Sequence, residues 1–595
     1  MEQHDAYQNL PSPLELTEAL ANAAAQSQGL LRQFIDKQGA TDLEQVDPLG
    51  LLPAFTAFTQ ELMRDPVRLA EMQINAWNAY AEIWQHAAQR LFGLPGSTTV
   101  DESGDRRFKA DDWDDNPFFD YVKQTYLVTA RMLQSIVADT DGLDEKTAQK
   151  VEFYTRQYLD AIAPTNFALT NPQVLHATIE TGGRNLVDGL KNFLADIDPH
   201  DGRLRTRMVD TSAFELGKNI AVSPGKIVFQ NELMQLIQYA PSTAEVYERP
   251  LLIIPPWINK YYILDLQPKN SFIKWAVDQG LTVFVISWVN PDASLADKDF
   301  DDYIREGPLA ALDAIKAATS EESVNVIGYC LGGTLLGGLL ALMKARGDER
   351  INAATFFTAM LDFSEPGDLG VFIDEQQLAG IEAIMNERGY LDGAEMATTF
   401  NMLRANDLIW SFVINNYLLG RQPMAFDLLY WNADSTRMPA RMHSTYLRKM
   451  YLENVFCEPG GFSIDGTPID LRRIDNPACF VSAMEDHIAP WKSTFAGARL
   501  FSGPVKFFLG QAGHVAGIIN PPGPREYSHF QGPEVGSLTA DEWLAQAHLV
   551  ETSWWNEWAS WIGEHGGEKV PARTPGDGDL AIIEDAPGSY VSLRI

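Results

Sequence analysis

The residue best suited to chemistry in this sequence is Cys330, which lies at the centre of Gly328-Tyr329-Cys330-Leu331-Gly332. An apolar run, Val324–Ile327, precedes this pentad, and a small-residue helical pattern follows it to about Lys344. This order is typical of a nucleophile elbow, a sharp strand-to-helix turn whose glycines let strand and helix approach each other. The central residue is strained there, and the start of the helix favours a thiolate. Phosphate-binding loops also carry glycines between strand and helix, but their spacings do not occur here.

A cysteine nucleophile needs a base, and the base needs an acid that orients it. In hydrolase-type sheets these residues follow the nucleophile in the order acid, then histidine, each on a loop after a strand. Asp486 follows the apolar run 479–484, and His514 follows the run 505–509. Taken singly, Asp486 is a candidate helix cap and His514 a candidate loop histidine, but their order favours a triad with Cys330. Glu485 is the alternative acid.

An oxyanion hole is expected to use the backbone N–H of Leu331 and a second N–H from the loop after the strand 251–254. That loop begins Pro255-Pro256-Trp257-Ile258. Because proline has no N–H, Trp257 or Ile258 is the candidate donor. The remaining cysteines, Cys457 and Cys479, are expected to be buried and inert.

A thiol nucleophile also bears on the reaction. Transfer of an acyl group from another thioester to Cys330 exchanges one thioester for another of nearly equal free energy, so the acyl group stays activated. Attack by an alcohol on the Cys330 thioester then gives an oxoester. Ester synthesis from an acyl-coenzyme A therefore suits the site if water is excluded. Hydrolysis of a thioester uses the same residues, so a cysteine-dependent thioesterase is an alternative.

The elements that must position these residues begin near Phe214. A hairpin is expected over 226–239, followed by buried strands at 251–254, 281–287, 324–327 and 354–358 with helices between the later ones. This alternation predicts a mostly parallel sheet covered on both faces. A helical, aromatic stretch over about 364–448 is expected as a lid, before strands at 478–482 and 505–509. The sequence thus predicts an α/β-hydrolase fold with a lid insertion over 214–595, closed by a tryptophan-rich core helix at 554–561.

The residues before this region are mostly helical in pattern. We expect a helical N-terminal region over 1–93, a linker over 94–115 and a helical N-terminal domain over 116–213. Asp65-Pro66 starts one helix whose apolar stripe is widened by Trp77 and Trp84. That stripe packs on its own domain or forms a surface for a partner, a second subunit or a hydrophobic product. A capping box at Ser12–Glu15 marks an earlier helix.

Composition limits the partners. The net charge of −34 makes nucleic acid an unfavourable partner, because phosphate contacts need Lys and Arg. Three cysteines without metal-ligand spacing fit a reducing cytosol, and no metal site is expected. The first residues lack a basic region followed by an apolar one, so no signal peptide is expected, and the apolar stretch 324–343 is expected as a buried strand and helix instead of a membrane span.

Several motifs resemble those of poly(3-hydroxyalkanoate) synthases. Besides Gly328–Gly333, they are Pro255–Leu266, Trp431-Asn432-Ala433-Asp434, Glu485–Trp491 and Gly513-His514-Val515-Ala516-Gly517. The resemblance runs from about Asn116 to the carboxyl end, and chain length and Leu331 resemble the class I type. It implies an acyltransferase that polymerises short-chain (R)-3-hydroxyacyl groups from their coenzyme A esters, with coenzyme A as part of the substrate and no separate cofactor.

The resemblance further implies that Cys330 carries the acyl group and His514 is its base. Asp486 either orients His514 or helps to activate the attacking hydroxyl. Candidate substrate-binding residues are Arg404, placed to meet coenzyme A phosphates, and Asn259 and His487; Arg404 alternatively forms a structural salt bridge. A homodimer working in the cytoplasm at the surface of polymer granules is expected, with granule proteins as partners. A non-catalytic granule-coating protein is the alternative from another class.

Overall fold

The computed structural model describes residues 51–92, 105–199, 202–524 and 526–594, which form two compact units. The first contains the described residues up to Asp210 together with Phe400–Met424, and the second contains Thr211–Thr399 and the described residues from Ala425 onward. The chain therefore enters the first unit twice. The expected helix start at residues 12–15 lies outside the described residues.

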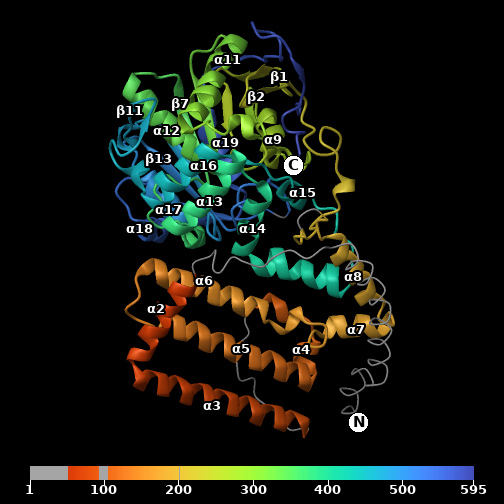
Figure 1. The fold of residues 1–595 in the computed structure, drawn as a ribbon. Helices are drawn as coiled ribbons and strands as arrows, with labels where there is room; N and C mark the ends of the chain where they lie inside the picture. The colour runs from red at the N-terminus through yellow and green to blue at the C-terminus, as the bar shows by residue number, and fades with distance from the viewer. Residues whose placement is uncertain (1–50, 93–104, 200–201, 525, 595) are drawn as a thin grey trace. The chain divides into compact units, whose positions relative to one another are not determined.

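The first unit is helical, as expected. In Figure 1, α3, α5 and α6 lie side by side, and α2 contacts α6. The main helices are α2 (Leu51–Arg64), α3 (Pro66–Leu91), α5 (Pro117–Ala138), α6 (Glu145–Ala161), α7 (Pro172–Glu180) and α8 (Arg184–Ala195). Helices α5 and α6 are separate, because the chain turns at Asp141-Gly142, where Gly142 has a φ of +93°.

Helix α3 begins as expected. Asp65 caps it by accepting a hydrogen bond from the N–H of Arg68 at 3.0 Å, and Pro66 is its first residue. The stripe that contains Ile83 faces the unit, and Ile83 is 1% exposed. Trp77 and Trp84, which were expected to widen this stripe, are 77% and 65% exposed. A rotation of about 100° per residue places them at the edge of the stripe, where the Trp84 ring lies 5.5 Å from the ring of Tyr121 on α5.

The described part of the expected linker contains packed structure. The helical turn η1 (Arg106–Phe108) and the short helix α4 (Asp112–Asp115) bring Phe108 and Trp113 into the core of the first unit. Their rings meet edge to face at 5.0 Å. The polar composition of this stretch favoured a linker, but two large aromatic side chains gain more from burial than the polar residues lose by local ordering.

The second unit is built on an eleven-stranded sheet within the described residues, in the order β15-β14-β13-β12-β7-β6-β4-β5-β2-β1-β17. Its central strands run parallel, and the hairpin strands β1 and β2 extend it antiparallel. The strands that position the site are β4 (Leu251–Ile254), β5 (Val283–Trp288), β6 (Val324–Tyr329), β7 (Ile351–Phe357), β12 (Ala478–Ala483) and β13 (Val505–Gly510). The hairpin strands are β1 (Gly225–Gln230) and β2 (Met234–Tyr239).

These strands confirm the expected α/β-hydrolase order, and the hairpin is where the sequence placed it. The short strands β14 (His529–Gln531), β15 (His548–Val550) and β17 (Glu584–Asp585), at the two ends of the sheet, were not expected. Strands of two or three residues are too short to show an alternating apolar pattern. Two isolated pairs were also not expected: β3 (Glu245–Tyr247) with β16 (Lys569–Pro571), and β10 (Ser463–Ile464) with β11 (Thr467–Pro468).

Helices cover the sheet around the elbow strand β6. The elbow helix α12 (Leu331–Arg346) is almost wholly buried. The closing helix α19 (Trp554–Glu564) confirms the expected core helix: Trp554, Trp555 and Trp558 are buried, and the ring N–H of Trp558 donates to Thr355 on β7 at 3.0 Å. None of the helices in the described ranges is long and apolar enough to cross a membrane.

The insertion between β7 and β12 is largely helical. It contains α13 (Glu375–Arg388), α14 (Gly393–Leu403), α15 (Asp427–Ala433), α16 (Ala440–Tyr446) and the π-helical segment η10 (Leu447–Leu452). The expectation of no strand between 364 and 478 is wrong, since the two-residue strands β8 (Tyr390–Leu391) and β9 (Met438–Pro439) pair here, as do β10 and β11. Residues 400–424, inside the expected lid, belong to the first unit.

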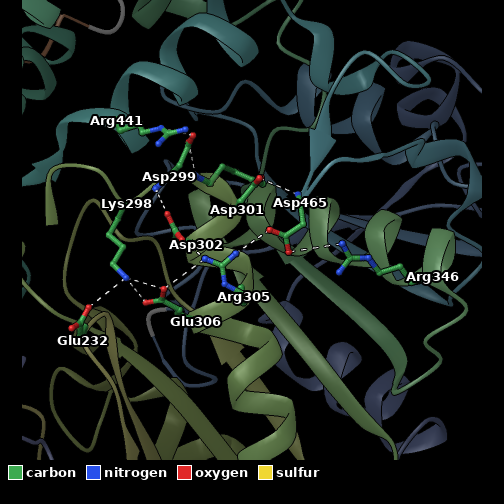
Figure 2. A network of polar contacts seen from close by, with 11 residues as sticks. Glu232, Lys298, Asp299, Asp301, Asp302, Arg305, Glu306, Arg346, Arg441 and Asp465 are labelled. Carbon is green, nitrogen blue, oxygen red and sulfur yellow. Dashed lines mark hydrogen bonds and ion pairs between the residues drawn. The ribbon is translucent and has the colours of Figure 1, made fainter.

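A network of charged residues joins the insertion to the sheet domain beside the elbow helix (Figure 2). Arg441 at the start of α16 pairs with Asp299 at 3.0 Å, next to α10 (Phe300–Ile304). Asp465 accepts from Arg305 at 2.9 Å and lies 3.8 Å from Arg346 at the end of α12. These partly exposed pairs are individually weak, so the network orients the elements more than it stabilises them.

Candidate active site

Cys330 occupies a nucleophile elbow. It joins β6 to α12 with a φ of +52° and a ψ of −118°, a strained conformation for a residue with a side chain. Its N–H donates to the carbonyl of Phe357 on β7 at 2.8 Å, which fixes the turn on the sheet. The Cys330 side chain is half-buried at the start of the helix.

Two glycines permit this turn. A Cβ on Gly328 would lie 2.5 Å from the Cα of Gly333, and a Cβ on Gly332 would lie 2.0 Å from the carbonyl oxygen of Ile254. Strand β6, helix α12 and the end of β4 therefore touch through their backbones. The glycine spacing in the sequence follows directly from this contact.

The structure brings Asp486 and His514 together beside the elbow. Asp486 follows β12 and His514 follows β13, and these strands are parallel neighbours. The Nδ1 of His514 and the Oδ2 of Asp486 are 2.8 Å apart. The other carboxylate oxygen of Asp486 accepts the N–H groups of Ile488 at 2.9 Å and Ala489 at 2.8 Å. Both oxygens of Asp486 are thus committed, and the imidazole is held in one orientation.

The imidazole of His514 also lies close enough to Cys330 to interact with its sulfur. Burial lowers the pKa of His514, but the charges of Asp486 and Cys330 and their hydrogen bonds outweigh it and raise the pKa to about 10. The ring also stacks on Tyr329, with centroids 6.0 Å apart. The arrangement holds a protonated imidazole at neutral pH beside the sulfur of Cys330, where it can act as an acid toward a leaving group.

The other cysteines lack this setting. Burial raises the pKa of Cys457 to about 11, and its thiol donates to the carbonyl of Asn454 at 3.3 Å. Burial also raises the pKa of Cys479, a residue inside strand β12. Both are poor nucleophiles at neutral pH. Glu485, the alternative acid, is exposed, whereas its neighbour Asp486 faces the imidazole.

The expected oxyanion donors lie next to the elbow. Leu331 is the first residue of α12, so its N–H has no acceptor within the helix. The loop after β4 begins against the same turn of the helix, because a Cβ on Gly332 would also lie 2.8 Å from the carbonyl oxygen of Pro255. Trp257 in this loop is buried and Ile258 is half-buried.

The three expected substrate-binding residues differ in their surroundings. The side-chain oxygen of Asn259 accepts the N–H of Lys260 at 2.9 Å, and His487 is half-buried. Arg404 belongs to the first unit, where it pairs with Asp407 on the surface at 2.5 Å. The salt bridge is one of the two roles considered for Arg404, and a role in binding coenzyme A remains a prediction.

Sequence analysis missed two tyrosines beside the nucleophile. Tyr446 and Tyr451 are buried, and their ring centroids are 5.4 Å apart. Burial raises the pKa of each tyrosine, and the charge of Cys330 raises it further. They are five residues apart where α16 continues as the π-helical segment η10. A spacing of five does not repeat on one face of an α-helix, so a search for helical periodicity passes over the pair.

The fold and the elbow at Cys330 place the chain among the α/β-hydrolase-fold enzymes. Residues 249–521 match the α/β hydrolase fold model, and residues 104–276 match the model described as the poly-beta-hydroxybutyrate polymerase (PhaC) N-terminus. The chain belongs to the poly(3-hydroxyalkanoate) polymerase family and is a polymerising acyltransferase. This confirms the resemblance seen in the sequence motifs.

The relatives that show the family match over most of their length. The poly(3-hydroxyalkanoate) polymerase of Methylorubrum extorquens is 46% identical, over 98% of this chain and 96% of its own. The polymerase subunit PhaC of Rhizobium etli is 47% identical, over 92% and 87%. The corresponding subunit of Cupriavidus necator is 39% identical, over 89% of each chain.

Proposed function

We propose that this polymerase carries the growing acyl group on Cys330, which takes (R)-3-hydroxyacyl groups from short-chain coenzyme A esters. The Cys330 thiolate attacks the thioester carbonyl, the bond to the coenzyme A sulfur breaks, and His514 gives its proton to the departing thiolate. In the second step the hydroxyl of another acyl unit attacks the Cys330 thioester and His514 takes the hydroxyl proton. The bond to Cys330 breaks, an oxoester forms, and the thiolate is restored.

The observation that carries this proposal is the position of His514 between Asp486 and Cys330. Both oxygens of Asp486 are engaged, by His514 and by two backbone N–H groups, and its side chain has no exposed surface for a substrate hydroxyl to reach. This favours orientation of His514 over activation of the hydroxyl as the role of Asp486. Each developing oxyanion is proposed to accept the N–H of Leu331 and that of Ile258 or Trp257.

The remaining assignments belong to the same proposal. Asn259 and His487 contact the acyl group or the pantetheine arm, and Arg404 meets coenzyme A phosphates. Coenzyme A enters as part of the substrate, and no separate cofactor takes part. The enzyme works as a homodimer at the surface of cytoplasmic polymer granules, together with granule-associated proteins. The acyl-coenzyme A substrate and polyester product follow from the polymerase reaction itself.

Brief exposure of the purified chain to (R)-3-hydroxybutyryl-coenzyme A tests the proposal. We expect coenzyme A release, polymer, and a 3-hydroxybutyryl adduct on the Cys330 peptide in mass spectrometry. Cys330→Ala is expected to lose all three, whereas Cys457→Ala, the matched control, retains them. Free 3-hydroxybutyrate without polymer would instead favour the thioesterase, and unchanged coenzyme A release in Cys330→Ala would remove the cysteine from the mechanism.

A further inference from the structure

The loop that supplies the second oxyanion donor is held through its backbone carbonyls. Residues 255–260 follow β4, and three of their carbonyl oxygens accept side-chain hydrogen bonds. Pro255 accepts from the ring N–H of Trp288 at 2.9 Å, Trp257 from the hydroxyl of Thr436 at 3.4 Å, and Lys260 from the ring N–H of Trp431 at 2.7 Å. Two of these donors, Trp431 and Thr436, come from the insertion, in and just after α15.

The bond from Thr436 determines which way the next peptide N–H points. In a trans peptide the carbonyl and the N–H point in opposite directions. Since the carbonyl of Trp257 is turned toward Thr436, the N–H of Ile258 is turned away from it. Of the two candidate donors, Ile258 is therefore the one whose N–H direction is fixed by an identified contact.

Lys260 anchors the far end of the loop. It is buried, and its ammonium group donates to the carboxylate of Asp434 and to the carbonyls of Val591 and Leu593, each at 2.8 Å. These three bonds use all three ammonium protons. The loop is thereby tied to the end of α15 and to a segment more than three hundred residues further along the chain.

Asp434 completes the anchor. It is buried, and its second oxygen accepts the hydroxyl of Tyr262 at 2.8 Å, just beyond the loop. Burial raises the pKa of Asp434 and lowers that of Lys260, and each charge opposes the shift of the other. A buried ion whose partner is removed is costly, so neither residue is replaceable without moving the backbone it holds.

We infer that Lys260, Asp434 and Thr436 are positioning residues that hold the Trp257–Ile258 peptide as an oxyanion donor. This inference rests on the proposed function, because it assigns a purpose to the loop only if Cys330 forms tetrahedral intermediates. It also links the insertion to catalysis, because the segment from α15 to Thr436 holds the Trp257–Ile258 peptide that stabilises the transition state. None of the three residues is required for the nucleophilicity of Cys330.

Two reactions of Cys330 distinguish a displaced oxyanion loop from a disturbed elbow or a partly unfolded protein. Acylation by (R)-3-hydroxybutyryl-coenzyme A develops an oxyanion, whereas alkylation by iodoacetamide displaces iodide at a carbon and develops none. Both need the thiolate and His514. A displaced loop therefore slows acylation alone, and a disturbed elbow or a partly unfolded protein slows both.

For Lys260→Met, which removes the ammonium but keeps the length of the side chain, we expect single-turnover acylation to fall by about 100-fold. Alkylation of the Cys330 peptide, followed by mass spectrometry, is expected to stay within about twofold of wild type. For Thr436→Val, which loses one neutral hydrogen bond at nearly constant shape, we expect a fall in acylation of roughly tenfold. Lys274→Met is the matched control, because that lysine pairs with Asp278 on the surface of α9 (Phe272–Asp278).

Equal losses in acylation and alkylation would overturn the inference, as would acylation at the wild-type rate in Thr436→Val. If Lys260→Met does not fold, the Thr436→Val result decides alone, because that change leaves the buried ion pair intact. Failure of the proposed function has a different signature, since wild-type protein would then show no acyl adduct on Cys330 at all.

Discussion

At the scale of single residues, His514 gives the stability of the protein one pH-dependent contribution. Its pKa is about 10 in the folded state against 6.5 for an ordinary histidine, because the charges of Asp486 and Cys330 outweigh its burial. A raised pKa means that the folded state binds this proton more tightly than the unfolded state. The resulting stability is complete below pH 6.5 and is lost as the pH rises through about 10.

We therefore expect wild type to exceed His514→Gln in free energy of unfolding most clearly near pH 6, by on the order of a few kcal/mol. This difference should shrink steadily between pH 7 and pH 10.5. Thermal or urea unfolding at fixed ionic strength measures it. Gly380→Ala in α13, which removes no titratable group, is the control, and its difference from wild type should not follow the same course. If the difference in free energy of unfolding between wild type and His514→Gln increased with pH, the raised pKa of His514 would be contradicted.

Much of the site was predictable at this scale, and the reason is geometric. Cys330, Asp486 and His514 each follow a strand, so a motif and the order of strands were enough to select them. Lys260 and Asp434 lie in two of the motifs that carry the resemblance, but their role gave no signal, because neither has a spacing that marks a site and the bonds of Lys260 reach Val591 and Leu593 far along the chain. Tyr446 and Tyr451 were hidden because a π-helical segment changes the period.

At the scale of elements, the contact between α12 and β4 leaves no space for a side chain. Gly332→Ala would place a Cβ 2.0 Å from the carbonyl oxygen of Ile254, a rigid backbone atom. Helix and strand must separate, which moves the N–H of Leu331 and the loop after β4 at once. We expect Gly332→Ala to lose at least about 100-fold in coenzyme A release and to unfold at lower temperature than wild type.

Gly380→Ala is the matched control for this change. Gly380 lies in α13 of the insertion with no other atom near a built Cβ. Alanine is favoured over glycine in a helix, so this variant should keep full activity and gain up to about 1 kcal/mol in free energy of unfolding. Wild-type activity in Gly332→Ala would mean that the elbow tolerates a gap between α12 and β4.

Helices and strands were predicted well where one face or both faces of the element are buried. The parallel strands β4, β6, β12 and β13 are short apolar runs, and their positions are confirmed. Trp77 and Trp84 lie at the edge of the apolar stripe of α3, and the sequence could not show that they stay largely exposed there, because exposure depends on the neighbouring helices. The short strands at the ends of the sheet could not be predicted, because their pairing depends on neighbours and not on their own pattern.

At the scale of the whole molecule, the first unit is assembled from two separate stretches of chain. Its second stretch, residues 400–424, comes from inside the insertion, and it includes the π-helical segment η9 (Val413–Leu418). Asn192 donates to the carbonyl of Asn416 at 3.0 Å, and Asn416 donates to the carbonyl of Arg207 at 2.8 Å. Both asparagines are buried. These bonds would be lost if the N-terminal helices were removed.

We accordingly expect residues 1–210 and 211–595, expressed as separate chains in one cell, to purify together through a tag on either one. Residues 211–595 alone should aggregate, because η9 then exposes polar groups and apolar side chains that were buried. Gly189→Leu tests the contact directly, since a Cβ at that position of α8 would lie 1.8 Å from the carbonyl oxygen of Tyr417. It should abolish copurification.

Lys191→Leu is the control for that variant, because Lys191 lies two residues along the same helix and pairs with Asp188 on the surface. It should leave copurification intact. A stable, monodisperse 211–595 fragment would contradict the shared unit and would mean that residues 400–424 fold without the N-terminal helices. Because residues 400–424 continue into α15, which bonds to the loop after β4, loss of the N-terminal helices should also lower acylation of Cys330 in any 211–595 protein that stays in solution.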